Sequence, residues 1–226
     1  MLSDMFYKLW QSGTLTLGIW ETIYMTLIST LAAYVIGLPL GIVLWVTGSG
    51  GLHPVRWLNR ALGLVVNIFR SIPFIILMVA MLPAAKAIVG TALGNKAMIV
   101  TLIIAAAPYV ARMVESSVKE VDSGVIEAAQ SMGTPNFKIV TRVLVPEAKP
   151  ALIVGAVISM VTILGYSAMA GTIGGGGLGQ IAITYGYERY KSDIIWVCVV
   201  LTVIIVQIIQ ELGMYIARHT DRRTAK

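Results

Sequence analysis

The chain has 226 residues, of which 57% are hydrophobic and only 12% are charged. An ordinary soluble domain carries about 25% charged residues, so this composition, with a mean hydropathy of +0.83, excludes a soluble globular protein. We expect an all-α membrane protein in contact with lipid, and we expect its net charge of +6 to set its orientation in the membrane rather than to bind nucleic acid. The single cysteine, Cys198, cannot form an internal disulfide.

Uncharged runs that approach or exceed the 20 or so residues needed to cross a bilayer recur along the chain. They predict five transmembrane helices at about 22–47, 61–85, 92–113, 150–170 and 193–215. Pro39 predicts a kink in the first span. The third span is short, and it reaches full length if Lys96 and Arg112 extend to the two membrane surfaces.

Lysine and arginine are distributed unequally between the two sides that five spans define. One side holds 12 of the 17 positive residues: Arg56, Arg60, Arg70, Arg112, Lys119, Lys138, Arg142, Lys149, Arg218, Arg222, Arg223 and Lys226. The other side holds five: Lys8, Lys86, Lys96, Arg189 and Lys191. Because positive residues are enriched in cytoplasmic loops, we expect the N-terminus outside and the C-terminus in the cytoplasm.

The segment 118–149, between the third and fourth spans, is a long patterned loop on the cytoplasmic side. Apolar residues recur at helical spacing in its first half. Asp122 or Ser123 can cap that helix at its start, and Gly133 can end it in the left-handed conformation. A short helix is therefore expected, held off the membrane.

A second short helix is predicted after the glycine. Thr134 is the expected N-cap, Pro135 the first helical residue, and Pro146 the residue that limits the helix. The pattern alone fits equally a helix pair lying on the lipid surface and a projection that docks in a groove of a partner protein.

Residue spacing in this loop matches a known motif. Glu127-Ala128-Ala129, three residues, Gly133, nine residues and then Val143-Leu144-Val145-Pro146 resembles the EAA loop of the permeases of ABC importers. Val143 and Val145 depart from that pattern by small apolar changes. The stretches 68–77 (IFRSIPFIIL), 106–115 (AAPYVARMVE) and 165–169 (GYSAM) are similar to the permease subunits of bacterial methionine importers, within the type I ABC importer family.

The resemblance implies a single transmembrane domain over 1–226 that works as a homodimer in the bacterial inner membrane. Two cytoplasmic ABC ATPase subunits are expected to bind the pair, and a periplasmic or lipid-anchored binding protein to deliver methionine, D or L. ATP and magnesium are expected on the ATPase, with no cofactor, metal or catalytic residue on this chain, which is not expected to be an enzyme. The coupling residues implied are Glu127, Ala128, Ala129, Met132, Gly133, Pro135 and Pro146.

Within that coupling helix, Glu127 is expected in the first turn, where its charge would complement the helix dipole and could pair with a basic group of the partner.

Further residues are candidates for the translocation path or its gate: Arg70, Pro73, Tyr166, Ser167, Met169 and Gly171. Arg70 is the only charge in the second span. It could contact a substrate carboxylate, but a structural role near a kink at Pro73 is favoured. For the residues near the outer end of the fourth span, a gate and ordinary helix packing both remain open.

The stretch 174–180 (GGGGLGQ) fits the glycines of two nucleotide-binding patterns. Neither holds, because Gln180 stands where a phosphate-binding loop needs lysine, no strand precedes the glycines, and nucleotide would be on the opposite side of the membrane. We instead expect 171–187 to be a flexible outer connection, or alternatively a tightly packed loop.

Three functions other than methionine import can be compared with the sequence. An intramembrane serine protease would use Ser167, but His53 and His219, the two histidines, are expected on the opposite side. A passive channel would need no coupling loop. An ABC permease for another amino acid or related small molecule remains open.

Overall fold

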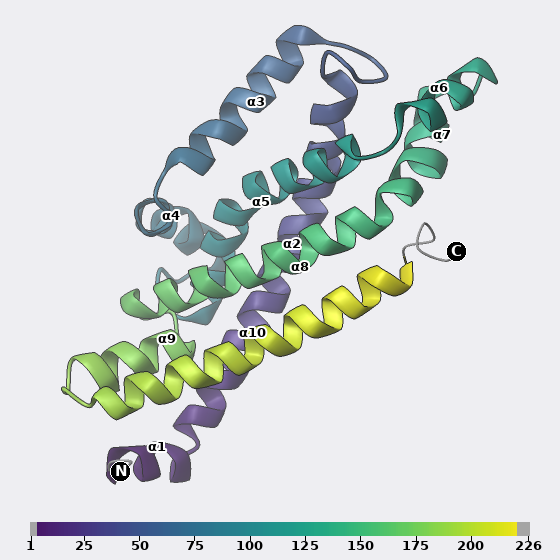
Figure 1. Cartoon of the computed structure of the whole chain (residues 1–226). Helices are drawn as coiled ribbons and strands as arrows, with labels where there is room; N and C mark the ends of the chain where they lie inside the picture. Colours follow the sequence, from purple (N-terminus) through teal and green to yellow (C-terminus); the bar gives the residue numbers. More distant parts are fainter. Residues whose placement is uncertain (1–3, 221–226) are drawn as a thin grey trace. The chain divides into compact units, whose positions relative to one another are not determined.

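The computed structural model describes residues 4–220, and these form helices without any strand (Figure 1). The positive residues Arg222, Arg223 and Lys226 lie outside the described residues. The α-helices are α1 (Asp4–Gln11), α2 (Thr14–Thr47), α3 (Arg56–Ser71), α4 (Phe74–Val89), α5 (Asn95–Lys119), α6 (Ser123–Ser131), α7 (Asn136–Ile139), α8 (Val145–Ala170), α9 (Gly177–Ile181) and α10 (Ser192–Thr220). Short segments of other helix types are η1 (Val140–Leu144) and η3 (Ala182–Tyr187), which are π-helical, and η2 (Gly171–Ile173), which is 3₁₀-helical.

Four helical segments of the described chain are long and apolar enough to cross a membrane: Thr14–Thr47, Asn95–Lys119, Asn136–Ile173 and Ser192–Thr220. A fifth crossing is counted if α3 and α4 together form one bent span. The all-α class is confirmed, and the number of spans is four or five.

The second predicted span differs from expectation because it is two helices rather than one. α3 ends at Ser71 and α4 begins at Phe74, with Pro73 as the extended N-cap (φ −54°, ψ 132°). Proline lacks the backbone N–H that would continue the helix, and it disfavours the helical conformation at the preceding Ile72. The expected kink at Pro73 is therefore a complete break.

Pro146 was expected to limit the second loop helix, and this prediction is wrong. The chain is helical without interruption from Asn136 to Ile173 and includes Pro146 and Pro150. The π-helical segment η1 lies immediately before α8, and there the N–H of Val145 bonds to the carbonyl of Val140. This wider turn changes the hydrogen-bond pattern where a proline would otherwise clash with the preceding turn.

By its internal packing the chain divides into two compact units. Among the described residues, the first contains the chain from Asp4 to Ala32 together with Ile72–Ala106 and Met160–Gln210, and the second contains Ala33–Ser71, Ala107–Ser159 and the chain from Glu211 to Thr220. One buried cluster of the first unit is Leu9, Leu15, Leu164, Leu178, Ile181, Ile194, Cys198 and Ile205. Cys198 is buried in this cluster, where it packs as a small apolar residue.

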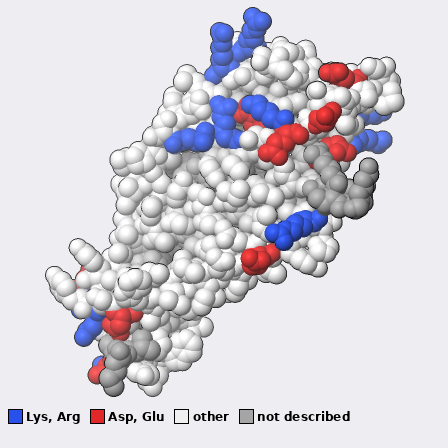
Figure 2. All heavy atoms as spheres, in the orientation of Figure 1, with Lys and Arg blue, Asp and Glu red and all other residues white. Residues whose placement is uncertain are grey.

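In the second unit α2 and α5 pack closely through small residues. A Cβ on Gly37 would lie 2.6 Å from Cγ1 of Val110, and one on Gly41 would collide with the carbonyl oxygen of Ala111. Glycines four residues apart let membrane helices approach closely. Large apolar side chains face outward elsewhere, and the face in Figure 2 is mostly uncharged, as expected for a surface in contact with lipid.

Candidate functional site

The helix α6 contains the Glu127-Ala128-Ala129 motif and has a defined start. The side chain of Asp122 accepts a hydrogen bond from the N–H of Gly124 at 2.7 Å, so Asp122 is the N-cap. This resolves the two alternatives that the sequence allowed. Glu127 is the fifth residue of α6 rather than part of its first turn, so the predicted complement to the helix dipole is wrong.

The end of α6 is a glycine turn. Gly133 has φ +72°, its N–H bonds to Gln130, and the N–H of Thr134 bonds to Ala129 at 3.2 Å. These two bonds form a Schellman motif, which satisfies carbonyl groups at the helix end. The expected left-handed stop at Gly133 is confirmed.

The second helix of the loop begins one residue later than predicted. Pro135 is extended (ψ 145°) and is the N-cap of α7, rather than its first helical residue, so Thr134 is not the cap. The carbonyl of Pro135 accepts from the N–H groups of Lys138 and Ile139 at 2.8 and 3.1 Å. α6, Gly133 and α7 together form a bent unit that we call the elbow (residues 123–139).

Some side chains of the elbow are largely exposed, and others are buried against the rest of the chain. Met132 and Phe137 are 78% and 79% exposed, whereas Ala129 and Ile139 are buried. Glu127 is also exposed, and its carboxylate makes no ion pair with any described residue. Large apolar side chains at the tip of a supported projection are typical of a surface that binds another protein.

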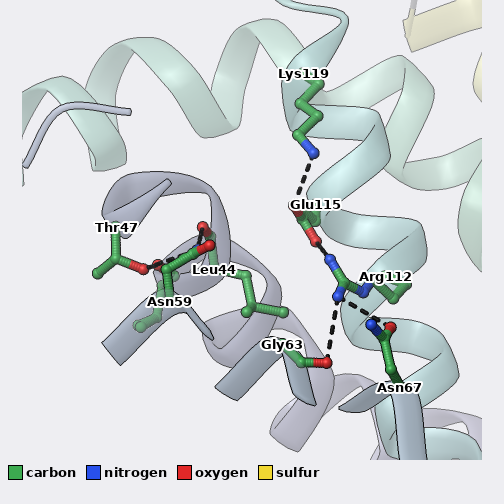
Figure 3. A network of polar contacts seen from close by, with 9 residues as sticks. Leu44, Thr47, Asn59, Gly63, Asn67, Arg112, Glu115 and Lys119 are labelled. Atoms are coloured by element: carbon green, nitrogen blue, oxygen red, sulfur yellow. Dashed lines mark hydrogen bonds and ion pairs between the residues drawn. The ribbon is translucent and has the colours of Figure 1, made fainter. Parts of the chain in front are cut away.

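A polar network supports the chain that leads into the elbow (Figure 3). The guanidinium of Arg112 pairs with Glu115, and Nζ of Lys119 lies 2.7 Å from the same carboxylate. Arg112 also donates to Oδ1 of Asn67 at 3.0 Å and to the carbonyl of Gly63 at 3.4 Å. The network therefore fastens the end of α5 to α3.

The charge of Arg112 is used inside the fold, and its extension to the membrane surface stays a prediction. The spacing of Arg112, Glu115 and Lys119, three and four residues apart, is the signal in the sequence that could have found the network. On the neighbouring turn, Oγ of Ser117 donates to the carbonyl of Ala151 in α8 at 3.2 Å. Both helices that flank the loop are thus tied together at its base.

The residues proposed for the translocation path or its gate have different surroundings. Arg70 is exposed in the last turn of α3. Tyr166 stacks on Phe74 with ring centroids 4.1 Å apart and an interplanar angle of 4°. Ser167 is buried and its hydroxyl donates to the carbonyl of Leu164 at 2.8 Å, whereas Met169 is 48% exposed. The aromatic partner Phe74 was missed because it lies in a different helix, 92 residues before Tyr166.

The glycine-rich segment 171–187 is mostly helical and closely packed, rather than a flexible connection. η2, α9 and η3 cover most of it, and Gly174, Gly176 and Gly177 have φ values of +82°, +79° and +75°. A Cβ on Gly171 would collide with the backbone nitrogen of Gln180. The expected close packing is therefore present, but most of the segment is helical rather than a loop.

Comparison with known proteins identifies the family of the chain. The family model of the binding-protein-dependent transport system inner membrane component matches residues 37–226. The chain belongs to this family. It is therefore a multi-pass inner-membrane component of a transport system, and not an enzyme.

Individual relatives cover nearly the whole chain. A Vibrio cholerae protein named "Probable D-methionine transport system permease protein MetI" is 49% identical over 212 residues, which is 94% of each chain. The methionine import system permease protein MetP of Bacillus subtilis is 46% identical over 80% of this chain and 82% of its own. A chain of the MetNI methionine ABC transporter, in an inward-facing conformation, superposes with a TM-score of 0.92 at 45% identity, covering 98% of this chain and 100% of that one.

Proposed function

We propose that the chain is the permease subunit of an ATP-driven importer that takes up methionine. The relatives named for methionine transport support the cargo, since two of them match at 46% and 49% identity over most of the chain. The single observation that carries the coupling role is the exposed elbow, in which the EAA motif and its glycine present Met132 and Phe137 outward.

In the proposed assembly two copies of the chain form the pathway and each elbow seats in a cleft of one ATPase subunit. ATP and magnesium bind to the ATPase, and a binding protein supplies methionine at the outer face. The N-terminus lies outside and the elbow in the cytoplasm, as the charge asymmetry predicts. Similarity to a MetNI methionine ABC transporter supports this arrangement.

The elbow acts as a lever when the ATPase subunits close on ATP. Met132 and Phe137 bind the cleft through apolar contact, and the carboxylate of Glu127 pairs with a basic group of the ATPase. The Schellman motif at Gly133 keeps α6 and α7 at a fixed angle. Force then passes to α5 and α8 through the polar network and the bond from Ser117 to Ala151.

Tyr166, Met169 and Gly171 form the outer gate of the pathway. The stacked pair of Tyr166 and Phe74 fixes α8 against α4. Met169 is exposed and offers a flexible, polarizable side chain, which suits a thioether substrate.

Reconstitution tests the coupling role and separates it from a passive channel. The chain would be placed in proteoliposomes with its ATPase and binding protein, and uptake of labelled methionine measured with ATP, without ATP and with a hydrolysis-deficient ATPase. Uptake that requires hydrolysis supports the proposal. Uptake that continues without ATP would identify a channel instead.

A further inference from the structure

We propose that Glu21 is a positioning residue of the transporter. Its carboxylate is a latch that fastens the glycine-rich turn after α8 (residues 174–178, here called the reversal) to α2, and this latch holds the outer gate shut. The link to the gate rests on the proposed function of Tyr166, Met169 and Gly171. The latch itself rests on hydrogen bonds within the first compact unit.

The carboxylate of Glu21 joins three segments that are distant in sequence. Its Oε2 accepts from the backbone N–H of Gly177 at 2.8 Å, and its Oε1 accepts from Nδ2 of Asn95 at 2.7 Å. The next residue, Thr22, accepts from the N–H of Leu178 at 2.9 Å through a hydroxyl that also donates to Gly18. One turn of α2 therefore holds two successive backbone groups of the reversal and the start of α5.

The carboxylate of Glu21 satisfies both partners, because each of its two oxygens acts as an acceptor. A glutamine would offer one acceptor and would face either Asn95 or Gly177 with a second donor. Such charge-assisted bonds are about twice as strong as neutral ones. A charged residue in a predominantly apolar transmembrane helix is rare and marks a functional position when it is paired.

The reversal is shaped to reach this carboxylate. Gly176 and Gly177 have positive φ, and a Cβ on Gly177 would lie 2.8 Å from Oγ1 of Thr22. A Cβ on Gly176 would collide with Oδ1 of Asn95. The glycines therefore allow the backbone to approach α2 and α5 at a distance that no side chain would permit.

Movement of the reversal must also move the end of α8. The N–H of Gly175 bonds to the carbonyl of Ala170 at 3.0 Å, and a Cβ on Gly179 would collide with the carbonyl of Ala168. Met169 lies between these two alanines. Release of Gly177 from Glu21 thus frees the backbone that positions Met169.

The test compares the single variants Glu21→Gln and Asn95→Asp with the double variant in the assembled transporter. In Glu21→Gln a donor of glutamine faces the donor of Asn95 once its oxygen accepts from Gly177. In the double variant the glutamine oxygen accepts from Gly177 while its amide donates to the aspartate, so both bonds of residue 21 are restored. Glu188→Gln, an exposed carboxylate in the same unit, is the matched control.

Two readouts separate the latch from the gate, and neither uses transported methionine. Hydrogen exchange of residues 171–181 reports the latch: we expect about tenfold faster exchange in Glu21→Gln, which corresponds to about 1.4 kcal/mol, and recovery in the double variant. Labelling of Met169→Cys by an impermeant maleimide, in a Cys198→Ala background, reports the gate and should accelerate by about the same factor.

Unchanged exchange in Glu21→Gln, or failure of Asn95→Asp to restore it, would overturn the latch. Faster exchange with unchanged labelling would overturn its link to the gate. If Glu21→Gln fails to assemble, Asn95→Ala, which removes one of the two bonds, must still accelerate exchange. These results stand whether or not methionine proves to be the cargo.

Discussion

Substitution of Gly133 should uncouple ATP hydrolysis from transport. The residue has φ +72°, and apart from its two chain neighbours no atom of the described residues lies within 4 Å of the position that a Cβ would occupy. The cost of a side chain is therefore conformational and not steric crowding. The left-handed region costs about 1–2 kcal/mol for a residue with a Cβ, and a β-branched side chain is disfavoured further.

A cost of one or two kcal/mol changes the ratio of bent to unbent elbow by a factor of about 5–30. We expect methionine uptake per ATP hydrolysed to fall by up to this factor in Gly133→Val, less in Gly133→Ala, and little in Gly133→Asn, because asparagine tolerates the left-handed conformation. The assay measures phosphate release and uptake in the same proteoliposomes.

Gly50→Val is the matched control, since Gly50 also has open space around its Cβ position but has no positive φ. It should leave the ratio unchanged. Equal coupling in Gly133→Val and the wild type would show that the left-handed conformation of Gly133 does not fix the angle of the elbow.

Three further predictions concern single contacts. Phe137→Ala should reduce copurification of the ATPase by about tenfold, as loss of an interface anchor does. Its thermal stability should be unchanged because the ring is 79% exposed. Full copurification of the ATPase would exclude Phe137 from the interface. Glu115→Gln should destabilise the chain by about 1–3 kcal/mol, because it removes the anionic partner of the partly exposed Arg112. The exposed Glu120→Gln should not alter the melting temperature. Equal melting temperatures of Glu115→Gln and the wild type would contradict the network's role. Gly171→Ala should lower the yield of folded protein, because its Cβ meets the backbone of Gln180. The control Gly165→Ala, with open space at its Cβ position, should express normally. Equal yields of the two variants would show that the segment 171–187 can shift to accommodate the added methyl group.

The sequence predicted those features that depend on local composition. Long uncharged runs locate most spans because the bilayer requires about 20 apolar residues. The left-handed conformation of Gly133 follows from its place at the end of an apolar periodic segment. The motif spacing around Glu127 predicted the family that the comparison confirms.

Features that depend on distant partners were missed. Glu21 was left outside the first span because a charge usually ends a transmembrane run, yet α2 begins at Thr14. The helix tolerates the charge because Asn95 and Gly177 satisfy it, and neither partner is close in sequence. The partners of Arg112 were missed for the same reason, since Asn67 and Gly63 lie in another helix.

Proline also has two outcomes that local rules do not separate. Pro73 interrupts the helix between α3 and α4, whereas Pro146 lies inside a continuous helix after a π-helical turn. The difference arises from the hydrogen bonds available to the preceding carbonyl groups, which depend on the packed structure.

The most direct test of the central claim is competition for ATP-dependent uptake in proteoliposomes that contain the chain, its ATPase and its binding protein. Labelled methionine would be offered against an excess of each of a panel of unlabelled amino acids, with both stereoisomers of methionine included. We expect ATP-dependent uptake that unlabelled methionine suppresses and that other amino acids leave largely unchanged. Absence of methionine uptake, with ATP-dependent uptake of another amino acid by the same vesicles, would contradict it.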